Sequence, residues 1–292
     1  MRNVHVAIPL ILLTCQTPFW TAQAHDATAQ SDSCAGEDRV VGDVLDPTLD
    51  TTRKSAPIAA MKAQADSGCA DASQVLGNLY RFGSALPGNP LRVDLSLAAK
   101  LLEQAGLGGE TSAFRDLAEL HLASNSPQDA MLPTQVYLWL QAHESTHPNQ
   151  EQPKVTGYDA DLLLRAQDAW HRSAQDDNAI QPVLSAYIGR HGPDMLAARD
   201  RLRELVAHRP SMSLATRPQI NPKKFPNKSG YALLRVEALP SGAISRVAIE
   251  SYGPTPDIAK QLLPIFAKAT VVPFAGEEPR SGKLPVVIAA SH

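Results

Sequence analysis

The feature that most constrains this chain is a helical pattern of apolar residues that recurs about 40 residues apart. The first copy has apolar or aromatic residues at positions i, i+4, i+7 and i+8, which places them on one face of a helix. Its members are Ala72, Leu76, Leu79 and Tyr80. The second copy, shifted by 41 residues, consists of Ala113, Leu117, Leu120 and His121. A fixed period of this length is typical of stacked helical repeats, in which each unit buries its apolar face against a neighbour.

A different helix is expected between the two copies. Asp94 is a suitable N-cap for it, and Gly106 is placed to end it. Its apolar positions are Ala98, Leu101, Leu102 and Ala105, and the corresponding positions of a later helix are Val136, Trp139 and Leu140. Two helix types in alternation predict a short solenoid of α/α hairpins over residues 55–208.

Gly77 stands in the middle of the first helix, where it costs about 1 kcal/mol relative to alanine. We interpret it as a point of close approach between two helices, where Tyr80 or a neighbouring leucine fills the space. Burying one leucine contributes about 1.5–3 kcal/mol, which offsets that cost. The alternative is a tolerated glycine without a packing role.

The pattern of these residues resembles the Sel-one-like repeat, a subclass of the tetratricopeptide-like repeats. The resemblance rests on Ala72, Leu76, Gly77, Leu79, Tyr80 and Gly83, followed by Asp94, Ala98, Ala105 and Gly106. It extends over about residues 55–145, and the second copy departs from it because Leu117-Ala118 replaces the Leu-Gly pair. The family implies stacked α-hairpins whose concave surface binds other proteins.

The period changes from helical to two near the C-terminus. Further helices are expected at residues 161–173, 182–188 and 193–207, and the proline-containing residues 209–229 are expected to connect two domains. Beyond them, Ala232, Leu234, Val236 and Ala238 alternate with Tyr231, Leu233, Arg235 and Glu237, as in a β-strand. A second strand at 244–251, a helix from Ile258 to Phe266 and a third strand at 283–290 complete a small α+β unit in the order ββαβ.

This order resembles the C-terminal domain of TonB-family proteins. Gly242 matches a glycine in the hairpin turn, Ser251 a serine at the strand end, and Pro273-Phe274 loosely an aromatic-proline segment. Pro264 departs from the pattern and is expected to kink or split the helix. The long spacer of energy-transducing members is missing. The family implies pairing of the sheet edge with a partner strand, and the residues expected at that edge are Leu284, Val286, Val287 and Ile288.

The first 24 residues have the order of a secretory signal peptide. Arg2 precedes a short apolar run at residues 6–13, and Ala22-Gln23-Ala24 forms an A-x-A site with cleavage expected after Ala24. A signal anchor and a lipoprotein modified at Cys15 are the alternatives. We therefore expect export to the periplasm of a Gram-negative bacterium, with no integral membrane span after cleavage. Residues 25–54 are expected to be poorly structured.

Export to an oxidising compartment makes the number of cysteines informative about disulfides. Removal of the signal would leave Cys34 and Cys69, and an even pair in an oxidising compartment favours a disulfide. The bond would close a loop that stabilises the fold by roughly 3–4 kcal/mol. Two unpaired thiols are the alternative.

Motifs for chemistry are weak. His143 and His147 have a spacing that could hold a metal on a helix, but Pro148 follows at once, and exposed histidines are the simpler interpretation. Lys223, Lys224 and Lys228 around Phe225 are interpreted as a solvated linker and not as a nucleic-acid site. We expect no cofactor, no metal and no catalytic residues.

Charge separates the two halves. Residues 25–214 carry a net charge of −9, whereas residues 215–292 carry +5. Such opposition either favours docking of the two domains or steers each to a different partner.

The sequence thus predicts a mainly α protein with a solenoid at 55–208 and a TonB C-terminal-like domain at 230–292. The expected function is a non-catalytic periplasmic adaptor with a periplasmic or outer-membrane protein partner. The alternatives are a membrane-tethered energy transducer for outer-membrane transport and a periplasmic hydrolase.

Overall fold

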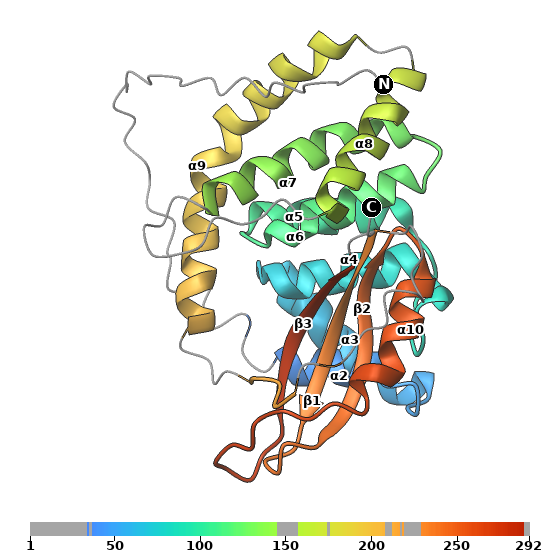
Figure 1. Cartoon of the computed structure of the whole chain (residues 1–292), viewed down its shortest axis with the longest axis vertical. Coiled ribbons are helices and arrows are strands. Elements are labelled where there is room, and N and C mark those ends of the chain that lie inside the picture. Colours follow the sequence, from blue (N-terminus) through green and yellow to red (C-terminus); the bar gives the residue numbers. More distant parts are fainter. Residues whose placement is uncertain are drawn as a thin grey trace.

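The computed structural model describes residues 34, 37–144, 157–173, 176–207, 212–216, 218 and 229–288. The fold is mainly helical, with a small three-stranded antiparallel sheet near the C-terminus (Figure 1). The expected signal peptide at 1–24 and His147 lie outside the described residues, as does most of the expected 209–229 connection. Within the described residues, no helix combines the length and apolar character needed to cross a membrane.

The helical part consists of elements that pack mainly on their neighbours in sequence. Its α-helices are α2 (Glu37–Leu45), α3 (Thr51–Asp66), α4 (Ala70–Phe82), α5 (Leu95–Leu107), α6 (Thr111–Leu122), α7 (Met131–Glu144), α8 (Gly157–Arg172) and α9 (Ile180–Ala207). Short 3₁₀ turns occupy Gly83–Ala85, Pro127–Ala130 and Asp177–Ala179. Asp94 caps α5, and its side chain accepts a hydrogen bond from the Leu97 amide at 3.0 Å.

Gly77 lies where α4 meets α5. A Cβ atom at this position would stand 2.8 Å from Cγ of Leu102 and 3.3 Å from the Ala98 carbonyl oxygen. The 2.8 Å contact with Leu102 is closer than a Cβ atom approaches without a shift, so the absent side chain allows the two helices to pack tightly. The close-approach interpretation of Gly77 therefore describes what the structure contains, with Leu102 filling the space.

Gly106 has a different role from the expected one. It does not end its helix, since α5 continues to Leu107 and the chain turns at Gly109, whose φ is +102°. A Cβ at Gly106 would meet the Phe114 ring at 2.5 Å, so this glycine admits the aromatic side chain of α6.

Three further expectations differ from the structure. Residues 25–54 include α2, and Val41, Val44 and Leu45 are buried in the main core, so this part of the segment is structured. The helices expected at 182–188 and 193–207 form one helix, α9, with Pro193 inside it. Of the kink or split expected at Pro264, the split is absent, since the helix α10 (Pro256–Phe266) continues through that proline in its last turn.

The sheet has the order β2-β1-β3 and consists of β1 (Gly230–Ala238), β2 (Ile244–Gly253) and β3 (Arg280–Ile288). Helix α10 packs on β1 and β2, whereas α2, α4 and α6 also contact the sheet. Residues 213–215 form a short pairing with residues 270–272 beside it. Both sides of β1 are therefore covered, and nearly all its residues are buried.

The two sides of β1 differ in chemistry. Ala232, Leu234 and Val236 belong to the same apolar cluster as Ile258 and Leu262 of α10. The alternate residues Tyr231 and Arg235 instead form polar contacts with α6 and α4. The predicted alternation of β1 is confirmed. Its polar side faces helices α4 and α6 and not the solvent.

Candidate functional site

The most elaborate polar arrangement in the described residues lies between the sheet and helices α4 and α6. We divide it into an Asp116 cluster and a Lys283 cluster. The Asp116 cluster consists of Gln74, Asn78, Arg115, Asp116, Tyr231 and Ser251. The Lys283 cluster consists of Asp71, Glu110, Arg235, Glu250 and Lys283.

Asp116 is fully buried and accepts hydrogen bonds from both structural parts. From α4, the side-chain amides of Gln74 and Asn78 each donate to Oδ2 at 2.9 Å. From the sheet, the Tyr231 hydroxyl and the Ser251 hydroxyl donate to Oδ1, the latter at 3.0 Å. A buried carboxylate is tolerated when donors and a cation surround it, and these bonds provide the donors.

The arginine beside Asp116 supplies the charge. Nη2 of Arg115 lies 3.5 Å from Oδ1 of Asp116, and the guanidinium stacks 3.7 Å from the centre of the Tyr231 ring. Burial alone would raise the pKa of Asp116, but Arg115, Arg81 and the hydrogen bonds from Asn78 and Tyr231 outweigh it and lower that pKa. Burial and the neighbouring Asp116 raise the pKa of Tyr231, so its hydroxyl keeps its proton and donates.

The network continues from the Asp116 cluster to α8 through Glu119. The Tyr158 hydroxyl donates to Oε1 of Glu119 at 2.6 Å, and Arg165 donates to both carboxylate oxygens at 3.0 and 2.6 Å. The Tyr158 and Tyr231 rings meet edge to face at 5.0 Å. Elements α6, α8 and β1 are thereby joined around buried aromatic rings.

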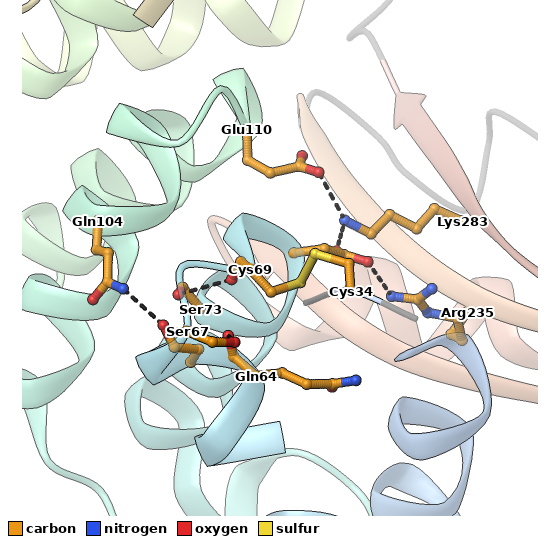
Figure 2. Close-up of a disulfide and its surroundings, with 11 residues drawn as sticks. Cys34, Gln64, Ser67, Cys69, Ser73, Gln104, Glu110, Arg235 and Lys283 are labelled. Carbon is orange, nitrogen blue, oxygen red and sulfur yellow. Dashed lines mark hydrogen bonds and ion pairs between the residues drawn. A yellow bond between two sulfur atoms is a disulfide. The ribbon is translucent and has the colours of Figure 1, made fainter. Parts of the chain in front are cut away.

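The Lys283 cluster joins all three strands to α4 and to the residue before α6. Arg235 of β1 bonds Oε2 of Glu250 in β2 at 2.9 Å and Oδ2 of Asp71 in α4 at 3.3 Å. Lys283 of β3 pairs with Asp71 and lies 3.6 Å from Glu110. Figure 2 shows Lys283 of the sheet directed toward Glu110, with Arg235 nearby.

A bulge in β2 explains how two adjacent residues reach the same side. Leu233 pairs with Ser251, but Leu234 pairs with Ile249, so Glu250 is an extra residue in the ladder. A bulge of this kind redirects side chains that would otherwise alternate. Ser251 consequently joins the Asp116 cluster, while Glu250 joins the Lys283 cluster.

The opposite charges of the two halves form ion pairs across the contact between the sheet and the helices. Arg235 and Lys283 of the sheet meet Asp71 and Glu110 of the helical part, and Arg246 of β2 lies 3.4 Å from both Asp43 and Asp46 around α2. Of the two interpretations of the charge separation, docking is therefore present in the structure. The chain's own sheet covers the side of α4 and α6 that carries these acidic groups.

The groups of these two clusters are bonded mainly to one another. The Ser251 hydroxyl is completely buried and is engaged by Asp116 and Tyr231, so a substrate has no access to it. Among the described residues, no group of three or more His, Cys, Asp or Glu side chains is arranged to hold a metal ion. His143 lies at the end of α7 and contacts the Trp139 carbonyl oxygen at 2.8 Å.

A hollow elsewhere on the surface lies along α9. It is lined by Pro182, Val183, Ala186, Tyr187, Arg190 and His191. The Tyr187 hydroxyl donates to Glu103 at 3.2 Å, and the Tyr187 ring packs on His191 with ring centres 4.8 Å apart. The hollow offers apolar and cationic groups and is separate from the two clusters.

The structure also places the other residues singled out in the sequence. A disulfide joins Cys34 and Cys69. The expected repeat-packing residues Ala72, Leu76, Leu79, Ala98 and Ala105 are buried. Tyr80 and Trp139 are half-buried. Strand β3 lies at an edge of the sheet, where the four residues expected to meet a partner strand are located.

The helix residues of the two clusters were missed in the sequence because they look like an exposed helix face. Gln74 and Asn78 lie opposite the apolar stripe of α4, and such polar faces are normally solvated. The signal that could have found them is the polar side of β1, where Tyr231 and Arg235 stand between buried apolar residues. A strand covered on both sides needs partners for such groups.

The gap in unfolding free energy between the wild type and Asp116→Asn is expected to narrow as the pH falls. Because the folded-state pKa of Asp116 lies below its usual 3.8, its stabilisation is present above about pH 5 and is lost as the pH falls through the folded-state pKa. Asparagine does not titrate. The full loss of about 1.4 kcal/mol for each unit of pKa depression is reached only below the folded-state pKa, so part of it is expected at about pH 3.

Urea denaturation of both proteins between about pH 7 and about pH 3 measures this gap. A gap that stays constant over this range would contradict an ionised, stabilising Asp116.

Comparisons with protein-family models, with curated proteins and with solved structures found no match to this chain.

Proposed function

We propose that this chain is a non-catalytic protein-interaction protein that acts in the periplasm and pairs a partner's extended segment with the outer edge of β3. Its helical part is proposed to be a Sel-one-like array and its sheet a TonB C-terminal-like domain. The observation that carries the proposal is the position of β3 at an edge of a sheet whose helix-facing side is already occupied. An edge strand presents backbone groups that can accept another strand.

Pro285 indicates which backbone N–H groups of β3 point away from β1. Proline lacks an N–H, so within a strand it fits where the nitrogen faces away from the neighbouring strand. The β1–β3 register runs without a shift from Gly230–Ile288 to Ala238–Arg280. Since backbone direction alternates, the N–H groups of Ser281, Lys283 and Val287 also point away from β1. Of the four residues expected at the edge, Val287 then has its backbone N–H directed toward a partner. The N–H groups of Leu284, Val286 and Ile288 are directed toward β1.

A photo-crosslinking residue at Val287, which is 42% exposed, is expected to give a discrete protein adduct in cells that export the chain. The same residue at Leu164 of α8, which is 65% exposed, is the control and should give none. Both positions are exposed enough to react, so an adduct at Val287 without one at Leu164 would indicate that the partner binds at the strand edge.

Ser281→Pro provides the matched test of backbone pairing. It removes an outward N–H without removing a bond to β1, so the fold should be retained. Because Pro285 already lacks an outward N–H, the substitution reduces the outward donors of β3 among Ser281, Lys283 and Val287 from three to two, and the adduct from Val287 should weaken. An adduct equally strong at Leu164, or one unaffected by Ser281→Pro in a folded protein, would contradict pairing at this edge.

A further inference from the structure

The disulfide is attached to an element that contacts both structural parts. Cys34 precedes α2, and Cys69 is the N-cap residue of α4. Helix α2 packs on α3 and on strands β2 and β3, with Val41 and Val44 completely buried between them. Its acidic residue Asp43 also pairs with Arg246 of β2 at 3.4 Å. Helix α2 thus spans the boundary between the helices and the sheet.

The two cysteines differ in burial. Cys34 is half-buried, whereas Cys69 is completely buried, so Cys34 is the cysteine at which we expect an incoming thiolate to attack. The sulfur of Cys69 is then the leaving group, and it leaves at the start of the 13-residue helix α4. The partial positive charge of a helix N-terminus stabilises a thiolate, and a stabilised thiolate leaves faster.

The bond also adjoins the Lys283 cluster. Figure 2 places Lys283, Arg235 and Glu110 beside the Cys34–Cys69 bond, with Asp71 two residues after Cys69 in the first turn of α4. Asp71 is the acidic group of α4 that pairs with both Arg235 and Lys283 of the sheet. Asp71 thus links the start of α4, where Cys69 stands, to the sheet.

We propose that the Cys34–Cys69 disulfide is a redox-controlled clasp that holds α2 over the boundary between the helices and the sheet. A dithiol reduces it in two exchange steps. The first thiolate attacks Cys34, forming a mixed disulfide and expelling Cys69 as a thiolate that takes up a proton. The second thiol then releases Cys34, so two protein thiols form and the dithiol becomes a disulfide. Reduction loosens α2 and the strands beneath it. This inference does not depend on the partner proposed for β3.

Hydrogen–deuterium exchange of the full chain tests the clasp. A Cys15→Ser background leaves Cys34 and Cys69 as the only cysteines. After reduction with dithiothreitol, with both thiols verified by alkylation, amides of α2 and β2 are expected to exchange at least tenfold faster. Amides of α7, which lies outside this contact, should keep their rates.

Cys34→Ser in the same background is the matched variant. It should show the fast exchange of α2 without reductant, and dithiothreitol should not change it further. The clasp is overturned if α2 keeps its exchange rate after verified reduction, or if α7 accelerates to the same extent, which indicates general destabilisation. Reduction of the folded protein keeps the test valid if Cys34→Ser does not fold.

Discussion

Replacing Asp116 with alanine is expected to lower the free energy of unfolding by about 3–5 kcal/mol. The carboxylate is fully buried and accepts bonds from α4, β1 and β2. Its removal leaves the buried Arg115 charge without its anion and leaves several donors without an acceptor. Denaturation in urea or guanidinium, followed by circular dichroism, measures the loss.

Asp168→Ala is the matched control for this substitution. Asp168 lies on α8, is 65% exposed and pairs along the helix surface with Arg172. Exposed pairs of this kind contribute little, so its effect should stay within about 0.5 kcal/mol. A loss below about 1 kcal/mol for Asp116→Ala would show that the Asp116 cluster does not hold the sheet in place.

Replacing Arg235 with methionine is expected to lower the free energy of unfolding by a similar amount, about 3–5 kcal/mol. Methionine keeps much of the aliphatic length, so the change removes mainly the charge. Arg235 is 2% exposed and bonds Glu250 and Asp71, which would then face each other with Lys283 as the remaining cation of the cluster. Repulsion between the two carboxylates adds to the free-energy cost of burying them.

A second substitution makes this prediction specific. Glu250→Gln in the Arg235→Met background removes one of the two carboxylates and should restore at least about 1 kcal/mol. Burial together with Asp71 and Glu110 raises the pKa of Glu250, which agrees with a cluster that holds more acidic than basic groups. If Glu250→Gln destabilises the double variant further, charge balance is not what Arg235 provides.

These two substitutions bear on function because they test whether buried charges hold the sheet permanently on the surface of α4 and α6. The side of α4 and α6 that would otherwise be open is covered by β1 and β2 through buried, paired charges. A partner that binds there must displace the sheet. An edge of the sheet needs no such displacement, which is why the proposed function places the partner at β3.

Local patterns in the sequence predicted the elements well. The Asp94 N-cap, the helix around Gly77 and the alternation in β1 all follow from short-range geometry, since a helix repeats every 3.6 residues and a strand every two. Proline and glycine were harder to interpret. Pro193 lies within α9 and is exposed, whereas Gly106 lies within α5, where the absent side chain admits the Phe114 ring.

The sequence by itself determined the two kinds of secondary structure, their order and the opposite charges of the two halves. Only the tertiary structure decided that these halves dock, that α2 belongs to the core, and that Gln74, Asn78 and Asp116 are buried. The physical reason is that periodicity shows which residues share a face, but not what covers that face. Pairing between residues more than one hundred positions apart, as between Asp116 and Tyr231, is set when the chain folds back on itself.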